Sequence, residues 1–456
     1  MAMLRIVAIV AVLCAAAVIG AIALEWRSAI DPVTRPDLKS FTTAQIKLGA
    51  QLAALGDCNT CHTAPGSRPF AGGVGVPTPF GTIYSTNISP DEDTGIGRWS
   101  ETAFRRALRE GVDREGRQLY PAFPYEHFTL LSDDDIAALY AFLMTRDGVR
   151  ATAPANALAF PFNIRPLVAG WKLMFLREGP YQPIASANDD WNRGAYLVEG
   201  VAHCGACHTP RNALGAEMVE RKFAGGEVEG WTAYALNDAS PAPVPWISQA
   251  LLDYLRNGWQ SDHGIARGPM APVIDNLAAA PDADLQAMTY YMTGAFGEPS
   301  AERRRAAEAL LIHVYRSESE PQPASASPQD PGARIYQAAC ASCHDNGRPL
   351  PYGGINLALS TGPSGPNARN VINVVLRGLP LASGERSPIM PGFANVLSDE
   401  QLAQLLVYIR SRFSDKPVWS NIDSDIRAAR SAHVAITSEH GTDAAGRAVS
   451  QHEAQR

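Results

Sequence analysis

The sequence predicts an all-α protein of three tandem helical domains behind an N-terminal membrane helix. Three observations predict this fold class. A five-residue motif occurs three times in the 456 residues, the segments around its copies recur in the same order, and a long apolar run follows the first five residues. The internal repetition defines the structural unit.

The repeated motif has the pattern Cys-x-x-Cys-His. Two thiols one helical turn apart can form thioethers with the two vinyl groups of one porphyrin, and the adjacent histidine can supply the proximal nitrogen to iron. A zinc site would require two such pairs close together, and a redox dithiol gives no reason for a histidine at the next position every time. We therefore expect three covalently bound haems of the c type. Their attachment residues are Cys58, Cys61 and His62, then Cys204, Cys207 and His208, then Cys340, Cys343 and His344.

The N-terminus carries one positive charge, Arg5, followed by an unbroken apolar run from Ile6 to Leu24. The run is longer than a usual signal-peptide core and about long enough to cross a bilayer. We expect residues 1–24 to be an uncleaved anchor, although Ala21-Ile22-Ala23 could serve as a cleavage site for a signal. In both cases the chain is expected on the periplasmic side of the bacterial cytoplasmic membrane, where haem is attached to this motif.

The same elements recur around each motif. A short helix leads into it, a Gly-rich loop follows, and a helix with apolar residues three and four apart closes the unit. The closing helices are expected to begin near Ser132, Pro281 and Ser398. This order defines three domains, which cover residues 41–148, 191–296 and 332–413.

Two linkers and a tail complete the chain. The linker 149–190 holds an apolar patch, Pro166 to Leu176, that is too short to span a membrane. The patch could be a helix packed on the haem domains, or a segment lying on the membrane or on a partner protein. The linker 297–331 ends in a Ser/Pro/Glu-rich stretch expected to be solvated, and the polar tail 414–456 is expected to be disordered or loosely held.

An electron-carrying haem usually has a second axial ligand, and methionine sulfur raises its reduction potential. Met390 and Met270 occupy equivalent positions on Pro-rich loops before the closing helices of the third and second domains. A single methionine is more often a core residue, but two at equivalent positions favour ligation. Met218 is a weaker competitor for the second haem because it follows the motif closely.

The first domain departs from this pattern, because Phe123 stands where the sulfur should be and phenylalanine cannot bind iron. Three alternatives remain open. His127, four residues further on, could be the ligand and give a bis-histidine haem of lower potential. The iron could instead be five-coordinate or water-bound, or Met144 could reach it from the closing helix. We favour His127.

Composition limits the possible partners and activities. The formal net charge is −7 and no basic stripe occurs, which argues against nucleic acid. The sequence has no flavin or molybdopterin signature, no G-x-G-x-x-G and no P-loop. No substrate site is therefore visible.

Further motifs carry a family resemblance. They are the Phe-Ala-Gly-Gly runs at Phe70 and Phe223, together with Thr78-Pro79-Phe80-Gly81, Tyr84-Ser85-Thr86-Asn87-Ile88 and Tyr120-Pro121-Ala122-Phe123-Pro124-Tyr125. With the three Cys-x-x-Cys-His motifs, they make the chain, over about residues 40 to 413, resemble the three-haem cytochrome c subunits of bacterial membrane-bound dehydrogenases. The resemblance implies three tandem class I cytochrome c-like domains. Family members serve quinoprotein alcohol dehydrogenases, flavin-dependent gluconate and sorbitol dehydrogenases, and molybdenum hydroxylases of the nicotinate and aldehyde dehydrogenase type.

The resemblance implies an electron-transfer subunit that is not catalytic on its own. Electrons would enter from a catalytic dehydrogenase subunit and leave to ubiquinone or a downstream oxidase or cytochrome. Relatives that serve alcohol dehydrogenases usually have methionine where this chain has Phe123, so the partner is expected to be of the molybdenum hydroxylase type, with a PQQ alcohol dehydrogenase or a flavin-dependent gluconate dehydrogenase as the alternative. A freestanding shuttle, or a peroxidase with Glu126 or His127 beside an open first haem, is less favoured.

Overall fold

The structure is a computed structural model, and it describes residues 26–317, 329–345, 353–379 and 389–441 together with Arg5, Gly20 and Arg348. Its contacts divide the chain into two compact units, Met1–Lys222 with Pro272–Met292, and Phe223–Ala271 with Thr293–Arg456. The expected anchor, residues 1–24, lies outside the described residues except at Arg5 and Gly20. Within the described part, no helix has both the length and the apolar character needed to cross a bilayer.

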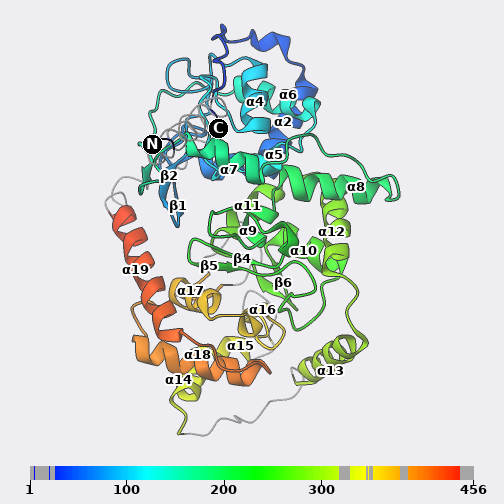
Figure 1. Ribbon diagram of the computed structural model, residues 1–456. Coiled ribbons are helices and arrows are strands. Elements are labelled where there is room, and N and C mark those ends of the chain that lie inside the picture. The colour runs from blue at the N-terminus through cyan, green and yellow to red at the C-terminus, as the bar shows by residue number, and fades with distance from the viewer. Residues whose placement is uncertain are drawn as a thin grey trace. The chain divides into compact units, whose positions relative to one another are not determined.

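The first unit is mainly helical. Its helices are η1 (Leu38–Ser40), α2 (Thr43–Leu55), α3 (Cys58–His62), α4 (Glu101–Glu110), α5 (Tyr125–Phe128), α6 (Asp133–Met144), α7 (Leu167–Phe175), α8 (Asp189–Ala195), the π-helix η2 (Tyr196–Val201), α9 (Gly205–His208) and η3 (Val219–Arg221). Helices α2, α4 and α6 pack together around one core (Figure 1). Strands β1 (Gly75–Thr78), β2 (Gly81–Tyr84) and β3 (Ala157–Leu158) form a small antiparallel sheet in that order.

The second unit is also mainly helical, with short strands. Its helices are α10 (Ser248–Asn257), α13 (Ala301–Ser317), α14 (Pro331–Ala339), α15 (Ala341–His344), α16 (Thr361–Ser364), α17 (Arg369–Arg377), α18 (Asp399–Phe413) and α19 (Ile422–Gly441). Strand β4 (Gly226–Val228) pairs with β5 (Trp231–Ala233), and β6 (Trp259–Gln260) pairs with β7 (Gly264–Ile265). Helices α11 (Met270–Leu277) and α12 (Asp282–Phe296) contribute residues to both units.

These short strands correct the all-α expectation. They lie mostly in the Gly-rich loops that follow the motifs and in the first linker, where apolar periodicity is absent. In the first loop, Gly75 pairs with Tyr84 and Thr78 with Gly81. Pairing into two-stranded ribbons satisfies backbone N–H and C=O groups that a loop would otherwise expose or bury unpaired. The protein is therefore helix-rich with small antiparallel ribbons.

The predicted starts of the closing helices are confirmed. The Ser132 side chain accepts a hydrogen bond from the Asp135 backbone N–H at the start of α6, and Ser398 does the same for Gln401 at the start of α18. Helix α12 begins at Asp282, one residue after Pro281. The serine hydroxyl accepts a hydrogen bond from a backbone N–H that has no partner within the helix. The acidic residues of the first turn interact favourably with the positive end of the helix dipole.

One helix crossing occurs three times, between the helix before each motif and the closing helix after it. At each crossing a glycine of the first helix lies against a backbone carbonyl of the second. A Cβ atom on Gly49, Gly194 or Gly332 would lie 2.0, 2.0 or 2.3 Å from the carbonyl oxygen of Ala138, Ala287 or Gln404, respectively. No side chain fits at such a distance, so glycine sets how closely these helices approach.

The tail is more ordered than its composition suggests. Trp419, Ile422 and Ile426 are buried in the core of the second unit, where α19 packs against α17 and α18 (Figure 1). The Trp419 indole N–H donates to the Gly365 carbonyl oxygen at 2.9 Å. The expectation of a loosely held tail is therefore wrong for residues 414–432. The few apolar side chains of this segment are enough to pack it against the core of the second unit. In the second linker, Ala301–Ser317 is helical, and the stretch 318–328 lies outside the described residues.

Candidate haem-binding sites

The first motif forms the short helix α3, and its histidine is fixed from behind. The His62 Nδ1 atom donates to the Thr86 carbonyl oxygen at 2.6 Å. A proton on Nδ1 leaves the lone pair on Nε2, which is the arrangement that metal-binding histidines use. Gly72, with φ +76°, donates to the His62 carbonyl, and a Cβ there would lie 2.5 Å from the Thr86 carbonyl carbon. The Phe-Ala-Gly-Gly and Tyr-Ser-Thr-Asn runs therefore meet behind this histidine.

The third motif repeats this arrangement with different residues. The His344 Nδ1 atom donates to the Ile355 carbonyl oxygen at 2.9 Å. Gly354 donates to the Cys343 carbonyl, and a Cβ on Gly354 would lie 2.6 Å from His344 Nδ1. The ring is thus held between its own helix and a glycine, with Nε2 as the nitrogen available to iron.

The second motif forms the helix α9, in which the His208 N–H donates to the Cys204 carbonyl oxygen at 3.0 Å. Met218 precedes η3 in the same unit. Met270 begins α11 and belongs to the second unit, whereas His208 belongs to the first. Ligation of the second haem by Met270 therefore stays a prediction.

The thiols fit covalent attachment. The structure describes all six motif cysteines, and none of them forms a disulfide. Burial raises the pKa of Cys58 and Cys204 to about 12 and that of Cys340 to about 11. At neutral pH these thiols are therefore protonated and uncharged, and their burial is compatible with a thioether, which also carries no charge.

Met390 has a defined position in front of the closing helix α18. Its backbone pairs with Leu379, with N···O distances of 3.1 and 2.7 Å in the two directions. Its half-buried side chain packs against the core of the second unit, as does Phe393. The residue therefore lies on an anchored loop of the third repeat, and its ligation of the third haem stays a prediction.

His127 lies in α5, but its partners come from the second repeat. Its Nδ1 atom lies 2.6 Å from the Glu199 carbonyl oxygen, and its Nε2 atom lies 2.7 Å from Glu217 Oε1. A Cβ on Gly205, inside the second motif, would lie 3.1 Å from His127 Cε1. Both ring nitrogens are engaged here, so binding the first iron would require His127 to give up one of these bonds.

The charges around His127 are coupled. Burial alone would lower the pKa of His127, but the hydrogen bond and charge of Glu217 outweigh it and raise that pKa. Burial would likewise raise the pKa of Glu217, yet His127 and Arg211 outweigh it and lower that pKa. Burial and the charge of Glu217 raise the pKa of Glu126 to about 7. The first and second repeats therefore share a buried imidazole–carboxylate pair.

Met144, the other candidate ligand of the first haem, and Phe123, which stands at the expected ligand position, both lie in packed surroundings. Met144 is completely buried at the end of α6, within the core of the first unit. Phe123 packs on Phe128, with ring centroids 5.4 Å apart, and Phe128 packs at the same distance on His203.

The first two attachment segments contact each other within the first unit. The His203 Nε2 atom, next to Cys204 in sequence, lies 3.2 Å from the Gly56 carbonyl oxygen, two residues before Cys58. Burial lowers the pKa of His203 to about 4, so the ring is neutral and its Nε2–H donates. The Asn276 amide donates to Asp57 Oδ1 and to Thr60 Oγ1 within the first segment. Sequence reasoning missed this junction, and its only signal was a histidine directly before the second motif.

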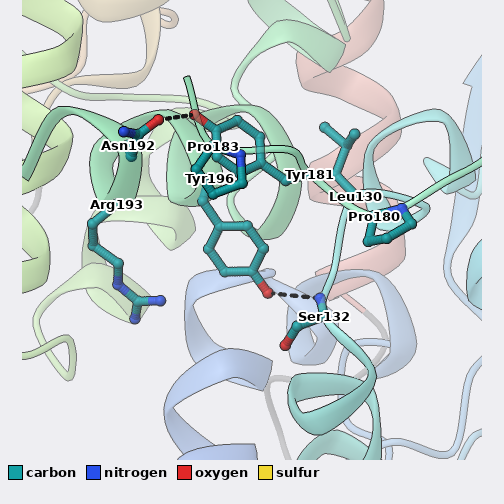
Figure 2. A pocket seen from close by; sticks show the side chains of 8 residues that line it. All are labelled: Leu130, Ser132, Pro180, Tyr181, Pro183, Asn192, Arg193 and Tyr196. Atoms are coloured by element: carbon teal, nitrogen blue, oxygen red, sulfur yellow. Dashed lines mark hydrogen bonds between the residues drawn. The ribbon is translucent and has the colours of Figure 1, made fainter. Parts of the chain in front are cut away.

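A pocket of about 290 Å³ lies in the first unit, where the first linker meets α6, α8 and η2 (Figure 2). Tyr181 Oη donates to Asn192 Oδ1 at 2.9 Å, and the Ser132 N–H donates to Tyr196 Oη at 3.1 Å. Arg193 forms a two-bond ion pair with Asp284. These bonds join the first linker to the second repeat around the pocket.

Attachment helices with thiols outside disulfides, and proximal histidines held by backbone carbonyls, define a c-type cytochrome. The family model described as cytochrome C oxidase, cbb3-type, subunit III matches residues 327–409. A nicotinate dehydrogenase subunit of Pseudomonas putida is 45% identical over 420 residues, which are 91% of this chain and 34% of that protein. The chain thus spans about a third of that relative.

Two further relatives match over most of their length. The fructose dehydrogenase cytochrome subunit of Gluconobacter japonicus is 36% identical, over 86% of this chain and 84% of that protein. The gluconate 2-dehydrogenase cytochrome c subunit of Pantoea cypripedii is also 36% identical, over 85% of this chain and 90% of that protein. The chain belongs to the family of cytochrome c subunits of membrane-bound dehydrogenases, which are electron-transfer components rather than catalytic subunits.

Proposed function

We propose that this chain carries three covalent haems c and passes electrons from a periplasmic dehydrogenase to ubiquinone or another acceptor of the respiratory chain. The observation that carries the proposal is the Cys-x-x-Cys-His helix, present three times, with the proximal ring held by a carbonyl at His62 and His344. A bound haem supplies reversible one-electron chemistry at each site.

The chain's own residues position and insulate these sites. The carbonyls of Thr86 and Ile355 orient the proximal rings and increase their basicity. The thiols fix the porphyrin, and Met270 and Met390 are proposed to complete the second and third iron sites with sulfur, which raises the potential. The sixth position of the first haem is proposed to belong to His127, to Met144 or to no side chain.

The contact between the first two attachment segments supports fast transfer within the first unit. His203 bridges to Gly56 by one hydrogen bond, and Asn276 holds Asp57 and Thr60. Because these segments are joined by direct hydrogen bonds, transfer between them needs no moving part.

The catalytic partner is proposed to be of the molybdenum hydroxylase type that oxidises nicotinate or aldehydes. Supporting this choice, the identity to the nicotinate dehydrogenase relative is 45%, against 36% for the fructose and gluconate dehydrogenase relatives. The position of Phe123 supports the same choice. The chain is proposed to lie on the periplasmic side of the cytoplasmic membrane, held by residues 1–24.

Two measurements test the proposal. Intact-mass spectrometry of the purified chain should show the mass of three haems, and the double change Cys340→Ala with Cys343→Ala should remove one. Purification from native membranes in mild detergent should recover a large molybdenum protein with the chain. A quinoprotein or flavoprotein in its place would overturn the choice of partner. A fully haem-loaded chain recovered alone would overturn the role within a complex in favour of a shuttle or a peroxidase.

A further inference from the structure

Helix α7 buries its one charged residue and exposes apolar ones. Lys172 is 8% exposed, and its ammonium donates to the carbonyl oxygens of Glu110 and Gly111 at 2.6 and 2.5 Å. The large apolar side chains of the opposite arc face outward, with Leu167 54%, Leu173 61% and Met174 52% exposed. A surface helix in water shows the reverse pattern, so this arc is built for an apolar environment.

The segment that leads into α7 also exposes large apolar side chains. Phe160, Phe162 and Ile164 are exposed, Phe160 to 79%. Gly170 has no heavy atom within 4 Å of a Cβ placed on it, so the helix surface is open there. We refer to Phe160, Phe162, Ile164, Leu167, Leu173 and Met174 together as the α7 face. A monomer in water rarely leaves so many large apolar side chains exposed in one stretch.

The first described residues after the N-terminal apolar run, Trp26 and Arg27, lie near this helix. The run stops at Leu24, and Arg27 then pairs with Glu110, Nε to Oε2 at 4.0 Å. A Cβ on Gly116 would lie 2.1 Å from the Arg27 carbonyl oxygen, so this backbone is fixed on the loop after α4. Because the Glu110 carbonyl also accepts the bond from Lys172, one residue contacts both Arg27 and α7. Trp26 is 71% exposed, as tryptophans at a membrane interface are.

The charged residues of the segment 157–177 also fit the surface of a bilayer. Besides the buried Lys172, residues 157–177 contain the cations Arg165 and Arg177 but no aspartate or glutamate, in a chain of net charge −7. Cations beside an apolar arc are the pattern of segments that lie in the interface of an anionic bilayer.

We propose that the α7 face lies on the surface of a lipid bilayer, beside the point where the N-terminal apolar run leaves it. This inference rests on the proposed membrane location, and it adds a second contact that fixes how the first unit faces the membrane. With two contacts, an anchored chain cannot rotate freely, and the same side of the first unit always faces the lipid.

Cysteine accessibility in the full chain tests the proposal. In a Cys14→Ala background, Leu173→Cys is compared with Val219→Cys, whose native side chain is 79% exposed in the same unit but outside the α7 face. Each haem-loaded protein, without any partner, is reconstituted into phosphatidylethanolamine–phosphatidylglycerol vesicles and treated with a water-soluble PEG-maleimide. Leu173→Cys should react at least about tenfold more slowly than Val219→Cys, because interfacial side chains lie below the headgroups. Both should react alike after denaturation.

The other outcomes overturn the proposal in distinguishable ways. Equal reaction rates in vesicles would show that water covers the α7 face. Protection that disappears on tenfold dilution of the protein in lipid would assign the face to a second copy of the chain. Protection in native membranes but not in vesicles would assign it to a partner protein. Failure to float with vesicles would remove the membrane location as well, while the haem count and the reducibility of the haems would still test the electron-transfer function separately.

Discussion

The glycine crossings allow a sharp test of the repeated architecture. Gly49→Ala would place a Cβ 2.0 Å from the Ala138 carbonyl oxygen, where ordinary contact begins at 3.4 Å. Helices α2 and α6 would have to separate by more than an ångström at the centre of the first repeat. Overpacking of this kind costs roughly 1–3 kcal/mol, occasionally more. A contact of 2.0 Å with backbone belongs at the upper end of that range. Since alanine gains about 1 kcal/mol over glycine in a helix, the net loss in free energy of unfolding should be about 2 kcal/mol.

Gly170→Ala is the matched control, because Gly170 also lies inside a helix but has no neighbour within 4 Å. It should be neutral or stabilising by up to about 1 kcal/mol. The assay is guanidinium unfolding of the haem-loaded proteins, followed by circular dichroism and analysed at a common m-value. A Gly49→Ala protein as stable as the wild type would refute the close crossing and, with it, the structural equivalence of the three repeats.

Three further predictions concern individual side chains. Gly354→Ala, whose Cβ would lie 2.6 Å from His344 Nδ1, should displace that ring and shift the potential of the third haem only, as measured by redox titration. His127→Ala leaves the buried Glu217 carboxylate with only the longer ion pair to Arg211, at 3.7 Å, and should lower the free energy of unfolding by up to about 3 kcal/mol. His263→Phe should reduce the loss of stability in acid, because burial lowers the pKa of His263 to about 3 while an unfolded histidine titrates near 6.5. The unfolded state thus binds the extra proton, and stability present above pH ~6.5 is lost toward pH 3, by up to about 2 kcal/mol between pH 7.5 and 5.

Each of these has a control. For Gly354→Ala, an unchanged third potential with an intact haem content would contradict the role of the glycine. For His127→Ala, the absorption spectrum decides whether the residue binds iron: a change of spin state at the first haem would show ligation, and an unchanged spectrum with reduced stability would show the bridging role alone. Phenylalanine at 263 keeps a ring on Trp246, on which His263 stacks at 3.5 Å. An acid loss as large as that of the wild type would assign the effect to other groups.

Several features could be deduced without coordinates. The attachment residues are predicted from the chemistry of two thiols and an imidazole at a fixed spacing, which depends on one helical turn and on nothing remote. The starts of α6 and α18 followed from Ser132 and Ser398, because a cap acts within three residues of itself. The reason for glycine at the three crossings lies in the close backbone approach, which the sequence does not show.

Other features depend on residues that are remote in sequence, so no local pattern could determine them. The carbonyls behind His62 and His344 belong to Thr86 and Ile355, and backbone acceptors leave no mark in the side-chain sequence. The packing of α19 against α17 and α18, and the small β-ribbons, depend on contacts between short segments and other parts of the chain.

The kind of cofactor could be inferred from the sequence alone, because Cys-x-x-Cys-His indicates covalent haem within five residues. The packing of the folded chain set which groups surround the motifs. It turned His127 toward Glu199 and Glu217 of the second repeat, joined His203 to Gly56, and placed Lys172 inside and Leu173 outside the first unit. The physical reason is that covalent reactivity is local, whereas burial and hydrogen-bond partnership are settled by the packing of distant segments.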